Sequence, residues 1–206
     1  MTIPFEALSK EKQEAIINAG LQVFGKSDYR HASTDDIARL AGVSKGSLFY
    51  YFHNKKELYG YLLEYAQQTI MKELRDDDIF QEPDFFLMME RSLKKKAELM
   101  KRNSYIFAFL LKAYPEASDD AKDVVYEKYD CMIDSTMAGI LKNIDTFRFK
   151  DGVDVERVWK LLYYFAEGYM RPFYTMDGPL DVDALADDFI AYMNMIKQYF
   201  YKEEYL

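Results

Sequence analysis

The sequence predicts an all-α protein, and two observations support that prediction. Apolar residues recur at spacings of three and four along most of the 206 residues, and no stretch alternates apolar with polar side chains as a strand would. Proline, glycine and clusters of acidic residues interrupt these stretches where helices are expected to end. No repeat with a period of roughly 20 to 50 residues is present, so a solenoid is not expected.

Nine helices are expected in order along the chain. The three acidic residues at 76–78, Pro83, Pro115 and the Gly178-Pro179 pair mark breaks between them, and residues 145–152 are expected to form a loop. Pro172 falls inside the eighth helix and is expected to kink it. The predicted ranges are 10–26, 34–41, 45–52, 55–76, 84–101, 103–113, 118–144, 154–176 and 181–202.

The second and third helices form a pair around a glycine. Ser33 and Asp36 match a capping box at the start of the first helix, whose apolar face begins at Ile37. Gly42 follows its last turn and supplies the left-handed backbone that ends a helix and reverses the chain. Ser44 is then expected to cap the next helix, whose first turn holds small and basic residues and presents free backbone N–H groups to an anion.

The second helix of this pair has an inner and an outer set of side chains. Leu48 and Phe52, four residues apart, are expected to face inward, which leaves Phe49, Tyr50 and Tyr51 on or near the surface. Tyrosine hydroxyls bond to phosphate oxygens, and a phenyl ring packs on the methyl group of thymine. The pattern predicts a nucleic-acid surface; the alternative is a small helical subdomain whose aromatic side chains are buried against the rest of the chain.

An enzyme is not expected. Residues 42–46 satisfy the G-x-S-x-G pattern of a serine-hydrolase elbow, but that elbow needs a strand before it and a histidine and an acid later in the fold. Here a capped helix precedes the motif, and His53 is the only histidine that follows it. We therefore expect no catalytic residues and no cofactor. Two histidines and the single cysteine, Cys131, lie far apart in the sequence, so neither a metal site nor an internal disulfide is expected.

Residues 10–60 resemble the DNA-binding domain of the tetracycline-repressor-like (TetR) family of one-component regulators. The resemblance rests on the long leading helix, on the run Thr34 to Ala38, on A-G-V-S-K-G from Ala41 to Gly46, on the aromatic run ending in Phe52, and on K-x-E-L from Lys55 to Leu58. It implies a nine-helix fold.

The resemblance also implies how the chain is divided and which residues contact DNA. A helix-turn-helix domain is expected at residues 1–54, and a helical effector-binding and dimerisation domain at residues 55–206. The family often carries tyrosine and histidine where this chain has Phe49 and Tyr51, so a hydroxyl and a cation are missing there. The residues expected at the DNA are Thr34, Ser44, Lys45, Gly46, Ser47, Phe49, Tyr50, Tyr51 and Lys55.

The charge of −8 is unevenly distributed and leaves the first domain slightly basic. Residues 1–60 carry eight Lys and Arg against seven Asp and Glu, which leaves nineteen against twenty-eight in the remainder. A domain charge of about +1 attracts DNA weakly, so we expect binding to depend on the doubled contacts of a dimer and to weaken steeply with salt.

The last two helices carry apolar stripes at spacings of three and four. Such stripes ordinarily form a core, and the resemblance implies instead a four-helix interface between two copies of the chain. The expected interface residues are Val158, Leu162, Leu185, Phe189, Met193 and Ile196.

Aromatic and methionine side chains are frequent in the helices that enclose an effector pocket in the TetR family. They suit an apolar ligand of variable shape, although an aromatic stripe is also typical of plain core. Glu167 adds a carboxylate that meets either a cationic ligand or Arg171, four residues on. The expected ligand-binding residues are Phe86, Met89, Tyr105, Phe109, Tyr126, Tyr129, Met132, Tyr164 and Glu167.

Together these features predict a homodimeric transcriptional regulator, a repressor that binds a palindromic double-stranded DNA operator under the control of a small apolar or aromatic effector. The alternative is a protein-interaction module on the same fold, with DNA binding secondary or absent. No apolar run reaches about 18 residues and no cleavable signal is recognised, so we expect a cytoplasmic protein without a membrane span.

Overall fold

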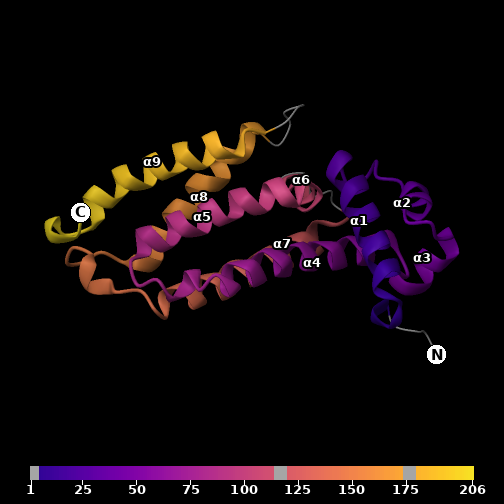
Figure 1. The fold of residues 1–206 in the computed structure, drawn as a ribbon, viewed down its shortest axis with the longest axis horizontal. Coiled ribbons are helices and arrows are strands. Elements are labelled where there is room, and N and C mark those ends of the chain that lie inside the picture. Colours follow the sequence, from indigo (N-terminus) through magenta and orange to yellow (C-terminus); the bar gives the residue numbers. More distant parts are fainter. Residues whose placement is uncertain (1–4, 114–119, 174–179) are drawn as a thin grey trace. The chain divides into compact units, whose positions relative to one another are not determined.

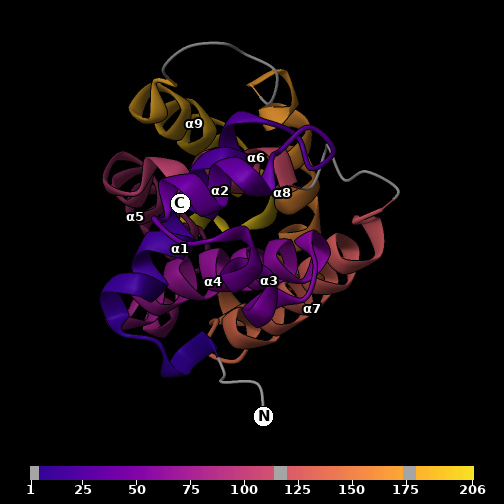
Figure 2. The ribbon, with the colours of Figure 1, turned by 90° about the vertical axis from the view of Figure 1, so that its right-hand side faces the viewer.

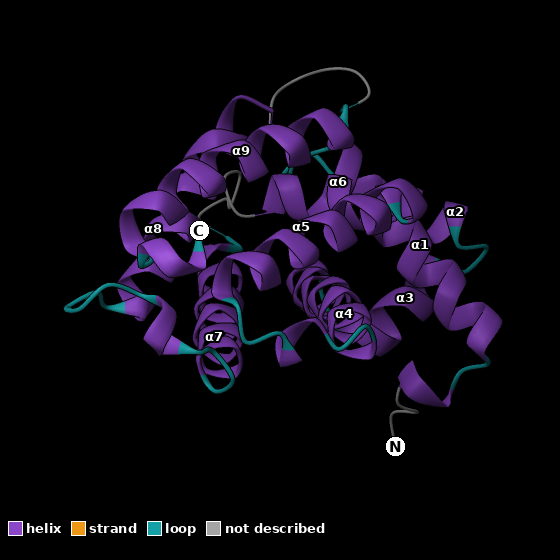
Figure 3. Ribbon diagram, turned by 60° about the vertical axis from the view of Figure 1, so that its left-hand side comes forward, coloured by secondary structure: helices purple, strands orange, loops and turns teal. Residues whose placement is uncertain are grey.

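The computed structural model describes residues 5–113, 120–173 and 180–206, and over these ranges the chain folds into helices joined by loops (Figures 1 and 3). The all-α prediction is confirmed, and so is the expected number of helices within the described ranges. The helices are α1 (Lys10–Lys26), α2 (Thr34–Leu40), α3 (Lys45–Phe52), α4 (Lys55–Asp76), α5 (Phe85–Arg102), α6 (Ser104–Ala113), α7 (Lys122–Leu141), α8 (Val155–Met170) and α9 (Val182–Phe200). None of these helices is both long enough and apolar enough to cross a membrane.

Most helix ends fall within two residues of the predicted positions, and two helices differ more. Helix α7 begins at Lys122 and ends at Leu141, where 118–144 was expected; residues 118 and 119 lie outside the described ranges. Helix α8 ends at Met170 and tightens into a 3-10 turn over Arg171–Phe173. The predicted kink within a longer helix is therefore wrong. Pro172 has no N–H to donate to a preceding carbonyl and ends the α-helix instead. Residues 174–176 lie outside the described ranges.

The chain forms two compact units, and the division falls within α4 and α7. Unit 1 holds residues 1–69 and 103–131, and so contains α1, α2, α3, α6 and the first parts of α4 and α7. Unit 2 holds residues 70–102 and 132–206, with α5, α8, α9 and the remaining parts of α4 and α7. A domain boundary between residues 54 and 55 stays a prediction.

In unit 1, helix α1 touches α6 at Gly25. A Cβ atom built at this position lies 3.1 Å from the backbone nitrogen of Phe109, so no layer of side chains separates the two helices there. Phe24, Tyr59 and Phe109 form a buried aromatic cluster beside this contact, with ring centroids 4.8 to 6.1 Å apart. This cluster fixes α1, the helix that supports the helix-turn-helix, to α4 and α6.

In unit 2, a buried polar network joins the start of α5 to the end of the chain. The Tyr201 hydroxyl donates to Asp84 Oδ1 at 3.0 Å and accepts from the backbone N–H of Phe85 at 3.1 Å. Arg148 donates to the other oxygen of Asp84 at 2.8 Å. Burial, together with the charge of Asp84, raises the pKa of Tyr201. The network holds the carboxyl end of the chain against the core of unit 2.

Candidate nucleic-acid interface

Helices α2 and α3 form a capped helix-turn-helix within unit 1 (Figure 2). Ser33 Oγ accepts from the N–H of Asp36 at 3.3 Å, and Ser44 Oγ accepts from the N–H of Ser47 at 3.0 Å. Gly42 has a φ of +67°, in the left-handed region that few other residues adopt. The two predicted caps and the predicted glycine turn are therefore present in the structure.

The inner face of α3 packs as predicted, and it has an additional partner. Leu48 is fully buried and Phe52 nearly so, and Ile37 of α2 is also fully buried. The ring of Phe52 lies 4.8 Å from that of Phe5, in a 3-10 turn at Phe5–Ala7 that precedes α1. This contact could not be predicted from the sequence, because a single turn of chain carries no periodic pattern. The turn covers the carboxyl end of α3.

The outer face begins with the exposed first turn of α3. Lys45, Gly46 and Ser47 are exposed, and a Cβ atom built at Gly46 would lie 3.8 Å from Ser44 Oγ, an ordinary contact. Packing within the described structure therefore does not require a glycine at position 46. A bare backbone there leaves the N-terminal N–H groups of α3 open to a phosphate.

The three outer aromatic residues of α3 differ in exposure. Tyr50 is 43% exposed, whereas Phe49 and Tyr51 are half-buried. The Tyr51 ring lies 6.0 Å from Phe5 and 5.3 Å from Tyr50. Of the three, Tyr50 presents the most surface to a partner, and the expectation that all three lie at the surface holds only in part for the other two.

The two lysines expected at the DNA already have partners in unit 1. Lys45 Nζ lies 2.9 Å from Asp35 Oδ2. Lys55 Nζ lies 4.8 Å from the centre of the Tyr29 ring and donates to the carbonyl of Arg30 at 3.2 Å. Burial lowers the pKa of Lys55. The Lys45–Asp35 pair also joins the first turn of α3 to the first turn of α2, where half-buried Thr34 lies.

The residues expected to bind an effector are distributed over both units. In unit 1, Tyr105 and Tyr126 are exposed, Phe109 belongs to the aromatic core, and the buried Tyr129 donates to the carbonyl of Leu110 at 3.3 Å. Their roles in ligand binding stay predictions.

The others belong to unit 2, apart from one that is not described. Phe86 is buried with its ring 5.0 Å from Tyr201, and Met89 and Glu167 are half-buried. Tyr164 is 68% exposed. The side chain of Met132 lies outside the described residues. Phe86 thus packs in the core around the Asp84 network, which accounts for it without a ligand.

Four of the six expected interface residues are buried within the protomer. Val158, Leu162, Phe189 and Met193 belong to the core of unit 2, while Leu185 and Ile196 are half-buried. A side chain that is already buried offers almost no surface to a second copy, so these four are better described as core. The exposed apolar side chains of the same two helices are Leu161, Tyr164, Tyr192, Met195 and Tyr199.

Comparison with known proteins agrees with this geometry. Residues 16–62 match the family model for bacterial regulatory proteins of the tetR family. Over 189 residues the chain is 24% identical to the HTH-type transcriptional regulator TtgR of Pseudomonas putida, covering 87% of each chain.

Solved structures share the fold. The fatty acid degradation regulator FadR from Bacillus halodurans superposes with a TM-score of 0.72 at 15% identity, over 87% of this chain and 96% of that one. NalD of Pseudomonas aeruginosa, the secondary repressor of the MexAB-OprM multidrug efflux pump, gives 0.68 at 15% identity, over 94% and 97%. With its capped helix-turn-helix, which the tetR family model matches, the chain is a DNA-binding regulator similar to TetR-family transcriptional regulators, and the relatives it matches are regulators and not enzymes.

Proposed function

We propose that the chain is a homodimeric repressor that binds a palindromic operator and responds to a small apolar or aromatic effector. The observation that carries this proposal is the first turn of α3, where Lys45, Gly46 and Ser47 are exposed beside the capping hydroxyl of Ser44. A short capped helix with small and basic residues at its start is suited to the major groove and its flanking phosphates. Such binding also implies a cytoplasmic location, where the operator is.

Exposed apolar side chains on α8 and α9 support a dimer. Leu161 and Tyr164 are three apart on α8, and Tyr192, Met195 and Tyr199 are three and four apart on α9, so each set follows one face of its helix. Exposed apolar patches of this kind mark interaction surfaces. We assign this surface to the dimer in place of the buried residues named above. A dimer also supplies a second set of phosphate contacts, which a weakly basic helix-turn-helix domain needs.

Repression follows the action of one fold relative, and effector control is proposed from the adaptable side chains in unit 2. NalD is a repressor, and we extend that action to this chain because a dimer on an operator excludes other proteins from the same DNA. Methionine and aromatic side chains, among them Met89, Met137 and Tyr163, surround the core of unit 2 as half-buried groups. These adaptable side chains suit an effector that binds one conformation better than another and so shifts the population that binds DNA.

Selection of duplexes from a random pool at about 0.1 M salt tests operator binding, because salt suppresses purely electrostatic association. We expect a palindrome with two half-sites. Lys45→Ala and Tyr50→Ala should then abolish binding to that palindrome while the variants remain folded dimers. Lys12→Ala, an exposed lysine of α1, is the matched control and should leave binding unchanged. Unchanged affinity in both test variants, or recovery of no preferred sequence, would contradict the proposal and favour a protein-interaction module.

The dimer surface has its own test. Leu161→Asp combined with Met195→Asp places charges on both exposed stripes and should convert the dimer to a monomer in analytical ultracentrifugation. Tyr105→Asp changes an exposed aromatic residue of α6 and serves as the control. A double variant that remains dimeric would place the interface elsewhere.

A further inference from the structure

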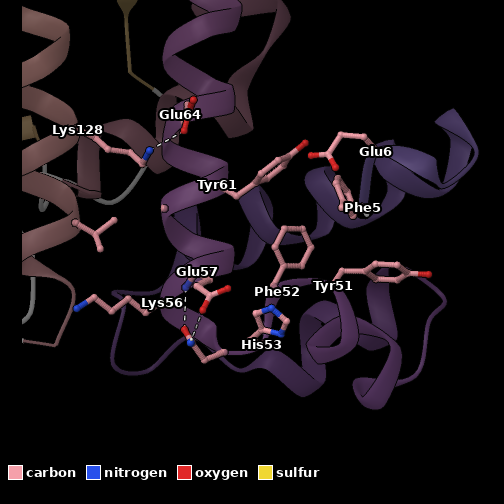
Figure 4. A pocket seen from close by; sticks show the side chains of 13 residues that line it. Phe5, Glu6, Tyr51, Phe52, His53, Lys56, Glu57, Tyr61, Glu64 and Lys128 are labelled. Atoms are coloured by element: carbon pink, nitrogen blue, oxygen red, sulfur yellow. Dashed lines mark hydrogen bonds and ion pairs between the residues drawn. The ribbon is translucent and has the colours of Figure 1, made fainter. Parts of the chain in front are cut away.

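A cleft with a volume of about 700 Å³ runs along the first turns of α4 in unit 1 (Figure 4). Gly60 of α4 lines the cleft, and one side is formed by the part of α7 that carries Val124 and Lys128. The other side is formed by the Phe5–Ala7 turn and the end of α3. None of the residues predicted to bind an effector lines it. The size suits a small organic ligand.

Three aromatic rings form one wall of the cleft. Phe5, Phe52 and Tyr61 lie with their ring centroids 4.8 to 5.3 Å apart, and each ring contacts the other two. Phe5 and Phe52 are buried, whereas Tyr61 is half-buried and lines the open cleft. Aromatic faces attract cations through their quadrupoles and also pack against apolar groups.

The two lysines that line the cleft are neutralised by acids of their own unit. Lys128 Nζ lies 2.6 Å from Glu64 Oε2, and Lys56 Nζ lies 2.7 Å from Asp123 Oδ2. An anionic ligand would have to break one of these pairs. The cleft is therefore poorly suited to phosphates or carboxylates.

Two further carboxylates at the cleft have no basic partner among the described residues. Glu57 accepts a hydrogen bond from the side-chain amide of Asn54 at 3.0 Å and forms no ion pair there. Glu6 points its carboxylate toward the hydroxyl end of Tyr61 (Figure 4). Burial raises the pKa of Tyr61, and the nearby charge of Glu6 raises it further. Within the described part of the chain, negative charge without a basic partner thus lies directly beside an aromatic wall.

We propose that this cleft binds a small organic cation with an apolar or aromatic body. The positive nitrogen lies between the Glu6 carboxylate and the ring of Tyr61, where charge attraction and the ring quadrupole act together. The apolar body packs against Phe52 and Val124. A neutral apolar ligand gains nothing from the carboxylates, and an anion is repelled by them.

A ligand bound in this cleft touches the carboxyl end of α3, the second helix of the helix-turn-helix. Tyr51 and Phe52 are the last residues of α3, and both line the cleft. A bound cation is therefore expected to change operator affinity, a consequence that rests on the proposed function. Binding of the cation itself does not depend on DNA, so the two are measured separately.

Calorimetric titration of the full chain with benzyltrimethylammonium chloride, without DNA, tests the site. Glu6→Gln and Tyr61→Leu should each weaken binding by about fivefold, since each removes one of the two attractions on the nitrogen. Glu14→Gln, an exposed acid of α1 that does not line the cleft, should leave binding unchanged. Phenylacetate, of similar size and opposite charge, should not bind.

The absence of saturable binding by the wild-type chain would overturn the proposal, as would equal binding by wild type and Glu6→Gln. The result for Tyr61→Leu is interpreted only if the variant unfolds at the same midpoint as wild type. If it does not, Glu6→Gln decides the test, because that substitution is at an exposed position and is not expected to affect folding. A chain that binds its operator but not the cation disproves this inference alone. A chain that binds the cation but no operator disproves the proposed function alone.

Discussion

The ammonium group of Lys45 lies 2.9 Å from the carboxylate of Asp35, and this pair links the first turns of the two helices expected at the DNA. The side chains are 51% and 69% exposed, so water screens the pair and a phosphate can replace Asp35 as the partner of Lys45. Once displaced, the carboxylate remains near the DNA backbone and repels it. Asp35 therefore opposes binding to any duplex, whatever its sequence.

Asp35→Asn should strengthen binding to random-sequence duplex by about two- to fivefold, the range expected for an exposed ion pair. The operator should gain no more than random DNA does, so selectivity does not rise. The matched control is Asp36→Asn, which changes charge equally but releases Arg39, its partner at 2.9 Å, and leaves Lys45 paired. Fluorescence anisotropy at several salt concentrations measures both variants. Equal effects from the two would assign the change to net charge and not to the Lys45 pair.

Gly42→Ala should destabilise the protein by about 1 to 2 kcal/mol, because an L-residue is strained at a φ of +67°. No atom lies within 4 Å of a Cβ atom built there, so the cost comes from the backbone and not from a clash. Gly139 is an exposed glycine in α7, also with no atom within 4 Å, and Gly139→Ala should stabilise by about 0.5 to 1 kcal/mol. Urea unfolding of the two variants should therefore give shifts of opposite sign.

Gly60→Ala should destabilise the protein because its Cβ would lie 2.9 Å from Val124 Cγ1. Valine is held in one rotamer within a helix, so the contact is relieved only by moving α4 from α7, at a cost of about 1 to 3 kcal/mol. In a Val124→Ala background the same substitution should instead stabilise by about 1 kcal/mol, the helix preference for alanine. A double-mutant cycle by chemical denaturation measures this; additive effects would show that the two helices are not in tight contact at this point.

Tyr201→Phe should lower the free energy of unfolding by about 1 to 3 kcal/mol at neutral pH, because Asp84 and the N–H of Phe85 each lose a partner in a buried site. Tyr105→Phe, at an exposed position, should have little effect.

The raised pKa of Tyr201 also predicts how stability depends on pH. The folded state keeps the phenol proton at pH values where the unfolded state loses it, so the contribution is complete below the ordinary pKa of 10.0 and is lost as pH rises above it. The wild-type free energy of unfolding should fall by up to about 1.4 kcal/mol per pH unit from this group, and Tyr201→Phe should lack that component. Parallel pH slopes for the two proteins near pH ~11 would contradict the assignment.

The sequence predicted features that arise within a few residues of one another. Ser33 and Ser44 cap helices through N–H groups three residues on, and the turn at Gly42 depends on its own backbone. The ion pair of Lys56 with Asp123, 67 residues away, and the ring contact of Phe5 with Phe52 have no local signature. Both contacts could be identified only from the tertiary structure.

The apolar stripes on α8 and α9 show a second limit of prediction from the sequence. Periodicity identifies the face of a helix that is buried, but it does not say whether the covering surface belongs to the same chain or to a second copy. Leu162 and Met193 are covered by their own protomer. Tyr164, which was predicted to bind the effector, and Tyr199 are exposed on the same two helices, and periodicity alone did not place either of them at the interface.

The backbone contact of Gly25 with α6 has a mechanical consequence. Side chains between two helices usually absorb a small displacement by changing rotamer, but here a Cβ atom would already lie 3.1 Å from the α6 backbone. A sliding movement of α6 along its axis is therefore expected to move α1 with it. Any larger residue at position 25 would separate the two helices and let each of them shift independently of the other.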